Sequence, residues 1–136
     1  MRAKDVMTRN VIMIEGSVTV AEAIKRMTEA KVSSLIINRR DSDDAYGIIT
    51  RRDIVSKIIA AGRNPEEIKV AEIMTKPLVI ATPNIDVKYL ARLMAQTGVR
   101  RVPIFDGHQL VGLVSNSDIF RGFSRDLIEK MEKREE

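Results

Sequence analysis

The chain has 136 residues, of which 44% are hydrophobic and 31% are charged, and its formal net charge is +4. This length and apolar content predict a soluble globular protein with a sizeable core. The absence of cysteine excludes disulfides, cysteine-ligated zinc and thiol catalysis. No leader-like apolar segment follows Met1 and no run is long enough to cross a membrane, so we expect a cytoplasmic protein.

The excess of basic residues permits binding to anions, from nucleotides to nucleic acids. Nucleic acid is the less favoured of these, because the chain has no tryptophan, two tyrosines and three phenylalanines. Its basic residues are also interleaved with acidic ones and form no basic run. Nucleic-acid binding therefore stays an alternative only.

The first strand expected along the chain is the apolar stretch 11–14, followed by a turn at 15–17. Thr19 then begins a helix, because Thr19 and Glu22 form a capping box ahead of apolar residues at helical spacing. That apolar face is predicted to lie in the core.

The stretches 35–37 and 46–49 are then expected to pair as antiparallel strands across a polar turn. A second helix is expected after Asp53 and ends at Gly62, which suits a left-handed C-terminal stop. The order of elements in this half is therefore β-α-β-β-α.

A short connecting helix is predicted to start at 64–67, with Asn64 as its cap and Pro65 at its first position. It would join the first half to a second half of the same kind. Each half of roughly 60 residues would be marginal alone, so we expect the two to pack their sheets into one shared core.

The second half repeats the pattern, with Asp86 as the cap of its first helix. The stretches 102–105 and 110–114 flank Asp106-Gly107, which is a strong hairpin signal. Pro103 cannot donate a ladder hydrogen bond, so its strand is expected at an edge or interrupted there.

An internal repeat underlies this similarity, since residues 5–8 return at 72–75 as Glu-Ile-Met-Thr. The shift of 67 residues becomes 65 between Asp53 and Asp118, and the difference falls in the turn before Tyr46. Length changes belong in exposed turns, so the chain is interpreted as a duplicated half-domain. We predict a first repeat at 1–62, a linker at 63–70, and a second repeat with a C-terminal helix at 71–136.

Two stretches carry the chemical signal of the chain, Gly47 to Asp53 and Gly112 to Asp118. Each predicts a buried strand ending in a hydroxyl residue that starts a helix, whose free N–H groups can hold a phosphate. The carboxylate three residues later can accept both vicinal hydroxyls of a ribose. The same spacing also fits a helix capping box, and a capping hydroxyl can still touch a ligand, so both interpretations stay open.

Other catalytic or metal-binding patterns are missing. The acidic turn at 41–44 lacks the glycine and the bidentate acid of an EF-hand loop, so it is interpreted as a solvated turn. His108 is the only histidine and is expected at the surface. With no nucleophile and base, Walker loop or dinucleotide fingerprint, we expect no enzyme, no metal and no required cofactor.

The chain resembles a tandem pair of CBS domains, the regulatory module named after cystathionine β-synthase. The resemblance covers roughly Ala3 to Phe123 and rests on the stretches 6–8, 73–75 and 99–104, together with the two Gly-to-Asp stretches. It implies an α+β fold in which two β-α-β-β-α repeats pack through their sheets into one disc with pseudo-two-fold symmetry. It also implies two clefts that bind AMP, ADP or ATP, with S-adenosylmethionine as an occasional ligand.

In the family each cleft combines the helix start of one half with strands of the other. Carried over, the Asp53 cleft would contain Ile48, Thr50, Arg52, Asp53, Thr75, Val79, Val99, Arg100, Arg101 and Pro103. The Asp118 cleft would contain Thr8, Ile12, Val32, Ser33, Ser34, Leu113, Ser115, Ser117 and Asp118. The resemblance therefore implies a non-catalytic, energy-sensing module for an unnamed regulated protein; a ligand-free scaffold and a nucleic-acid binder remain the alternatives.

The clefts are expected to be unequal, because Arg100 and Arg101 stand where the first half has Ser33 and Ser34. Arginine binds phosphate bidentately, so the Asp53 cleft should take the phosphorylated ligand first.

A homodimer is also expected, because apolar residues recur every four positions beyond the last motif, at Ile119, Phe123, Leu127 and Met131. Such a stripe needs a covering surface. CBS discs commonly pair through their helices, and the alternative is that the stripe packs on its own chain.

Overall fold

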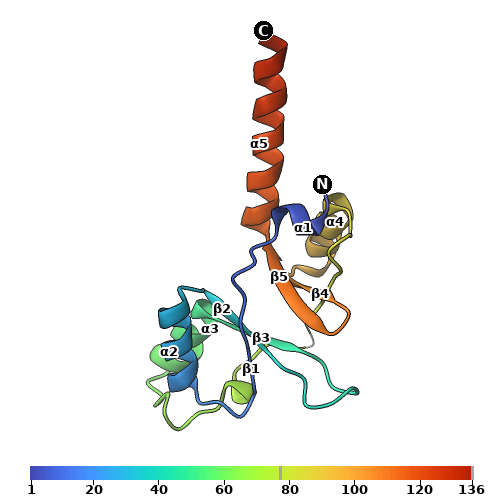
Figure 1. Cartoon of the computed structure of the whole chain (residues 1–136). Helices are drawn as coiled ribbons and strands as arrows, with labels where there is room; N and C mark the ends of the chain where they lie inside the picture. Colours follow the sequence, from blue (N-terminus) through green and yellow to red (C-terminus); the bar gives the residue numbers. More distant parts are fainter. Residues whose placement is uncertain (77, 136) are drawn as a thin grey trace. The chain divides into compact units, whose positions relative to one another are not determined.

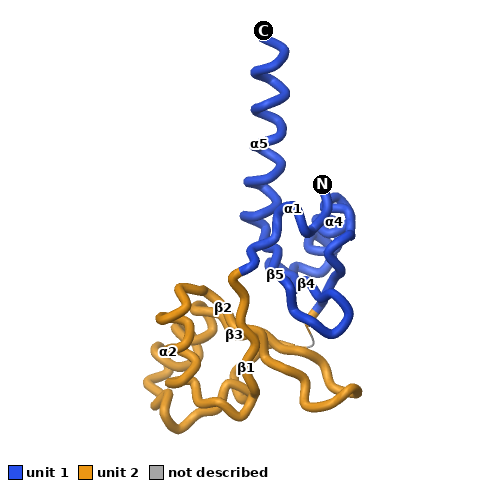
Figure 2. The backbone as a smooth tube through the Cα atoms, viewed as in Figure 1, with its two compact units in different colours: residues 1–9, 79–136 blue, residues 10–78 orange. Residues whose placement is uncertain are grey.

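The computed structural model describes residues 1–76 and 78–135. The chain divides into two compact units, shown in different colours in Figure 2. Unit 1 comprises Met1–Arg9 and Val79–Glu136, and unit 2 comprises Asn10–Leu78. Both combine helices with small sheets, so the α+β class is confirmed.

Unit 2 is built around a three-stranded sheet in the order β1-β2-β3. Strand β1 pairs parallel with β2, and β2 pairs antiparallel with β3, with Ser34 opposite Thr50. The regular elements of unit 2 are β1 (Met13–Ile14), α2 (Val20–Ala30), β2 (Ser34–Ile37), β3 (Gly47–Thr50), α3 (Arg51–Ile54), the π-helix η1 (Val55–Ile59) and the 3-10 helix η2 (Val70–Glu72).

Helix α2 begins where the sequence predicts, because the side chain of Thr19 accepts a hydrogen bond from the backbone of Glu22 at 3.2 Å. It ends at Lys31, which adopts the left-handed conformation at φ 58°. The equivalent residue of the second repeat is Gly98, at φ 75°. Both repeats therefore stop this helix with the same backbone turn, and the first does so without glycine.

The helix predicted at 64–67 is absent, and this expectation is wrong. The side chain of Asn64 closes a single turn by accepting a hydrogen bond from Glu66. The backbone oxygens of Pro65 and Ile68 accept bonds from Ala21 and Val20, the first residues of α2. Because these oxygens satisfy the free N–H groups of another helix, the segment forms a cap and not a helix of its own.

The core of unit 2 is a continuous apolar cluster in which the sheet is covered by helices. Its fully or nearly buried members are Ile14, Val20, Ala23, Met27, Leu35, Ile37, Ile49, Ile54, Ile58, Ile68, Val70 and Ile73. Isoleucine and valine dominate this set, and among them Ile14, Ile37 and Ile49 come from the three strands.

Unit 1 contains a hairpin, two packed helices and one long helix. Its elements are α1 (Ala3–Val6), α4 (Val87–Thr97), β4 (Arg101–Asp106), β5 (Gln109–Ser115) and α5 (Asn116–Glu135). Asp86 caps α4 by accepting the backbone N–H of Lys88, a bond that lowers the pKa of Asp86. The Asp106-Gly107 turn joins β4 to β5 as predicted. The unit's buried cluster is Ala3, Leu90, Met94, Val102, Ile104 and Val114.

Pro103 lies in β4 opposite Leu113 of β5. On its other side β4 is bridged by Ala81, whose backbone N–H donates to the oxygen of Pro103 and whose oxygen accepts from Phe105. This single bridge does not require a backbone N–H from Pro103, so the expectation of an edge position is confirmed.

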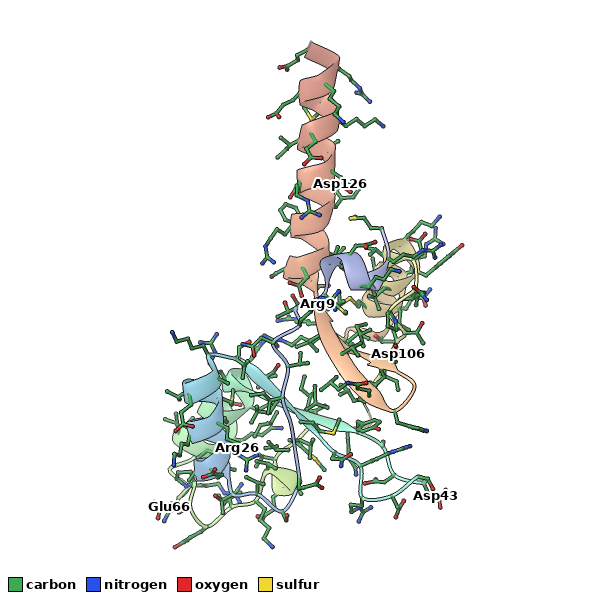
Figure 3. All side chains as sticks on the ribbon, viewed as in Figure 1. Arg9, Arg26, Asp43, Glu66, Asp106 and Asp126 are labelled. Carbon is green, nitrogen blue, oxygen red and sulfur yellow. The ribbon has the colours of Figure 1, made fainter. Side chains whose placement is uncertain are left out.

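Helix α5 runs well beyond the rest of unit 1 (Figure 1). Its first turns pack on α1, where a Cβ added at Gly122 would lie 2.7 Å from Val6. Farther on, side chains around Asp126 project on every side of the helix (Figure 3). Large apolar side chains there are exposed, with 60% of Phe123 and 45% of Leu127 accessible.

The opening segment of each sequence repeat packs in the unit that holds the other repeat's motif. Met7 lies against Gly112 of β5, and Met74 lies against Gly47 of β3. Thr8 and Thr75 continue these contacts as backbone bridges to Leu113 and Ile48. Each compact unit therefore combines the opening segment of one sequence repeat with the remainder of the other. Gly47 and Gly112 leave room for the methionines, because a Cβ at either position would collide with one.

Gly112→Ala is expected to lower the free energy of unfolding by roughly 1–3 kcal/mol, because the added Cβ overlaps the Met7 side chain. Urea denaturation followed by circular dichroism measures this loss. In a Met7→Ala background the same change should cost clearly less, since the obstructing side chain is gone. An equal cost in both backgrounds would mean that Met7 is not the cause.

Candidate functional site

The helix start at Asp53 is a closed capping box within unit 2. Asp53 Oδ2 accepts hydrogen bonds from the backbone N–H and the hydroxyl of Thr50, at 2.9 and 3.0 Å. The hydroxyl of Thr50 accepts the backbone N–H of Asp53 in return, at 3.2 Å. The capping interpretation is therefore confirmed here, and it uses only one of the two carboxylate oxygens.

The other oxygen, Asp53 Oδ1, lies 3.6 Å from the ammonium of Lys57. That ammonium donates its hydrogen bond elsewhere, to the backbone oxygen of Ile73 at 2.8 Å. The Asp53 side chain keeps 19% of its surface exposed. A carboxylate oxygen at a helix start is thus left accessible.

The Asp118 helix start in unit 1 makes the same capping hydrogen bonds as the Asp53 helix start. Asp118 Oδ2 accepts the backbone N–H and the hydroxyl of Ser115, at 2.8 and 3.0 Å. Its second oxygen is also engaged, by the hydroxyl of Thr8 at 3.3 Å and the guanidinium of Arg121 at 3.2 Å. Only 7% of this side chain is exposed.

A threonine lies beside each helix start. Thr75 exchanges two backbone hydrogen bonds of 2.9 Å with Ile48, two residues before Thr50. Thr8 does the same with Leu113, two residues before Ser115. Each unit therefore gathers a helix start, a strand end and the threonine of the opposite repeat's opening motif.

The predicted site residues divide between the two units. For the Asp53 site, unit 2 brings together Ile48, Thr50, Arg52, Asp53 and Thr75. Unit 1 contains Val79, Val99, Arg100, Arg101 and Pro103. For the Asp118 site, unit 1 brings together Thr8, Leu113, Ser115, Ser117 and Asp118. Unit 2 contains Ile12, Val32, Ser33 and Ser34.

A cavity of about 640 Å³ lies in unit 2 between α2 and the helix that starts at Arg51. Val32 and Ser33, both predicted for the Asp118 site, line it beside Arg51. The remaining lining is largely apolar and includes the exposed side chains of Val55 and Ile59.

One ion-pair cluster was not foreseen from the sequence. Asp44, in the longer turn of the first repeat, accepts hydrogen bonds from Arg40 at 3.0 Å and from Lys76 at 2.6 Å. The bond from Arg40, reinforced by that from Lys76, holds the pKa of Asp44 well below its usual range. Lys76 stands next to Thr75 in the sequence, but its charge is already paired within unit 2.

The described residues, 1–76 and 78–135, contain no clustered metal ligands and no long apolar helix. They hold no group of three or more His, Cys, Asp or Glu side chains placed to ligate a metal. No helix among them is long and apolar enough to cross a membrane.

A model of the CBS domain matches the chain twice, over residues 3–60 and 70–125. The chain belongs to the CBS domain family. The two matches confirm the resemblance to a tandem CBS pair that rests on the repeated motifs. Proteins built from this module are commonly regulatory and bind ligands.

Solved structures and curated proteins resemble this CBS pair over most of its length. A hexameric CBS-CP12 protein from bloom-forming cyanobacteria is 47% identical, with a TM-score of 0.83 over 96% of this chain and 74% of its own. Hypoxic response protein 1 of Mycobacterium tuberculosis is 33% identical over 88% of this chain and 82% of that protein. An uncharacterized protein of Methanopyrus kandleri is 34% identical over 86% of this chain, which spans only 60% of that relative.

Proposed function

We propose that this CBS pair is a regulatory module that binds adenine nucleotides and has no catalytic activity of its own. The observation that carries the proposal is the Asp53 helix start, where a carboxylate held by its own cap keeps one oxygen accessible. Ribose is the ligand part that matches it, because its two adjacent hydroxyls can both donate to one carboxylate.

The phosphate would bind at the beginning of the same helix. The backbone N–H of Arg52 follows the Thr50 cap, whereas that of Arg51 donates to the backbone oxygen of Ser33 at 3.0 Å; helix starts attract anions through such free groups and through the helix dipole. Both arginine side chains are exposed and add positive charge nearby.

Adenine nucleotides are expected to stabilise the folded protein if this proposal holds. A ligand at a hundredfold excess over its dissociation constant adds about 2.7 kcal/mol, which raises Tm by several degrees. Thermal unfolding with AMP, ADP, ATP and S-adenosylmethionine, each at millimolar concentration, measures the effect. Unmoved melting curves with all four would refute the proposal and favour a ligand-free scaffold.

The nucleic-acid alternative has a separate signature. Binding to an oligonucleotide weakens steeply as salt rises, because phosphate contacts release condensed ions. A titration with a mixed-sequence oligonucleotide at two salt concentrations therefore distinguishes this alternative from nucleotide binding.

We also propose that the CBS pair self-associates through α5. The helix carries exposed large apolar side chains on either side of its contact with α1 at Gly122, namely Phe120, Phe123, Leu127, Ile128 and Met131. Apolar surface of this extent is typical of an interaction site. Ile119 of the predicted stripe is only half-buried and packs against the unit 1 cluster, so the exposed stripe begins one residue later.

A further inference from the structure

The two helix starts differ in how many acceptor positions they leave for a ligand. A carboxylate offers about four lone-pair positions, two on each oxygen. At Asp118 four donors fill them: the backbone N–H and hydroxyl of Ser115 on Oδ2, and Thr8 and Arg121 on Oδ1. A ribose could bind there only by displacing donors that are already in place.

Asp53 differs at a single oxygen. Its Oδ2 accepts the same two bonds from Thr50, but within residues 1–76 and 78–135 Oδ1 has no hydrogen-bond donor. Lys57 lies 3.6 Å away as an ion pair and donates to Ile73 instead. Two acceptor positions are therefore left, which is the number that a ribose diol needs.

Of the two donors on Asp118 Oδ1, Thr8 has a threonine counterpart in Thr75, whereas Arg121 differs between the two repeats. Shifting Arg121 back by 65 residues, the spacing of Asp53 and Asp118, leads to Ser56. The hydroxyl of Ser56 donates to the backbone oxygen of Arg52 at 2.9 Å and makes no bond to the Asp53 carboxylate. The longer guanidinium of Arg121 reaches Asp118 across one helical turn.

We propose that Arg121 acts as a plug that disfavours nucleotide binding at Asp118, so that this CBS pair takes its first nucleotide at Asp53. The inference rests on the proposed function and names the residue that makes its two sites unequal. Arg121 occupies an acceptor position of Asp118 with a charge-assisted hydrogen bond at 3.2 Å, whereas Lys57 lies 3.6 Å from Asp53 and donates to Ile73 instead.

The plug is also removable. The Arg121 side chain is 72% exposed, and exposed ion pairs are weak, so its loss leaves the helix intact. Thr8 remains as the other donor on Oδ1, but a neutral hydroxyl at 3.3 Å is easier to displace than a charged group. We expect removal of Arg121 to strengthen binding at Asp118 by about tenfold, the share of one charge-assisted hydrogen bond at a partly exposed site.

Reciprocal exchange of the two residues tests this directly by calorimetric titration with AMP. The wild-type chain should show one tight site per chain. Arg121→Ser should add a second site, and in an Asp53→Ala background it should restore binding that Asp53→Ala alone removes. Ser56→Arg should weaken the tight site by placing a guanidinium beside Asp53.

Arg125→Ser is the matched control, because it removes the same charge from the same helix and Arg125 pairs only weakly with Asp126, at 3.7 Å. Should Ser56→Arg fail to fold by circular dichroism, the Arg121→Ser arm still decides. A wild type with a tight site, together with an Arg121→Ser variant that behaves like Arg125→Ser, overturns the plug alone. Two equal sites in the wild type also overturn it, and a wild type that binds no nucleotide overturns the proposed function itself.

Discussion

Replacing Phe123 and Leu127 together by glutamate is expected to leave the protein as single chains of 15.3 kDa, whereas the wild type should form dimers or larger assemblies. Both side chains lie on α5 beyond its contact with α1, with 60% and 45% of their surfaces exposed. Burying apolar area contributes roughly 25 cal/mol per Å², so in the proposed assembly these large side chains would carry much of the association energy. Two carboxylates at the same positions would have to be desolvated without partners.

Static light scattering at micromolar concentration measures the mass of each variant. Arg125→Gln with Lys133→Gln is the control, because this pair changes the net charge of α5 by the same amount and leaves the apolar stripe intact. Circular dichroism shows whether α5 remains helical in both variants. A wild-type mass of one chain, or equal loss of mass in the control, would contradict association through the stripe.

Local sequence signals predicted the elements of this fold well wherever a short-range interaction decides the structure. Thr19 and Asp86 each cap a helix because the cap needs only the next few residues. The Asp106-Gly107 hairpin formed for the same reason, since its turn residues fix the pairing of the two strands.

The segment at 64–67 shows where such signals fail. Its residues favour a helix start, but the backbone oxygens of Pro65 and Ile68 serve the first residues of α2. That partner lies more than forty residues earlier in the chain, so no local pattern reveals it. Tertiary hydrogen bonding decided between two conformations of similar local preference.

The exchange of the opening segments between the two units also depends on contacts between residues that are far apart in the sequence. The repeat of Val-Met-Thr and Ile-Met-Thr was visible in the sequence, but it did not reveal that Met7 packs on Gly112 and Met74 on Gly47. A duplicated sequence indicates that two similar units form. Which copy of a segment joins which unit depends on contacts between residues far apart along the chain.

The sequence predicted the two helix starts of the candidate site but not the side-chain ion pairs around them. The Thr50 and Ser115 caps with their carboxylates are short-range features and were expected. The pairs Arg121 with Asp118 and Lys76 with Asp44 were not predicted, because they depend on long side chains whose orientation a sequence does not specify. A count of basic residues in the sequence therefore overstates the positive charge available to a ligand, because some of these residues are already paired with carboxylates.

Asp53→Ala is expected to have the larger effect on binding, and Asp118→Ala the larger effect on stability. Asp53→Ala should abolish the tight calorimetric phase with AMP, because it removes the accessible acceptor for the ribose. Its cost in folding free energy should be about 1 kcal/mol, the contribution of a capping interaction. Asp118→Ala should leave the tight phase nearly intact, because its carboxylate is already saturated by four donors.

The loss of folding free energy should be larger for Asp118→Ala than for Asp53→Ala. Asp118 is only 6% exposed, so its removal leaves several donors without a partner in a buried place, at about 1–3 kcal/mol for each donor that water cannot reach. Thermal unfolding without ligand and calorimetry with AMP, done on both variants, give the two measurements. The assignment is reversed if the tight phase survives Asp53→Ala and disappears in Asp118→Ala, and a Tm loss larger in Asp53→Ala would show that Asp118 is less engaged than its four bonds indicate.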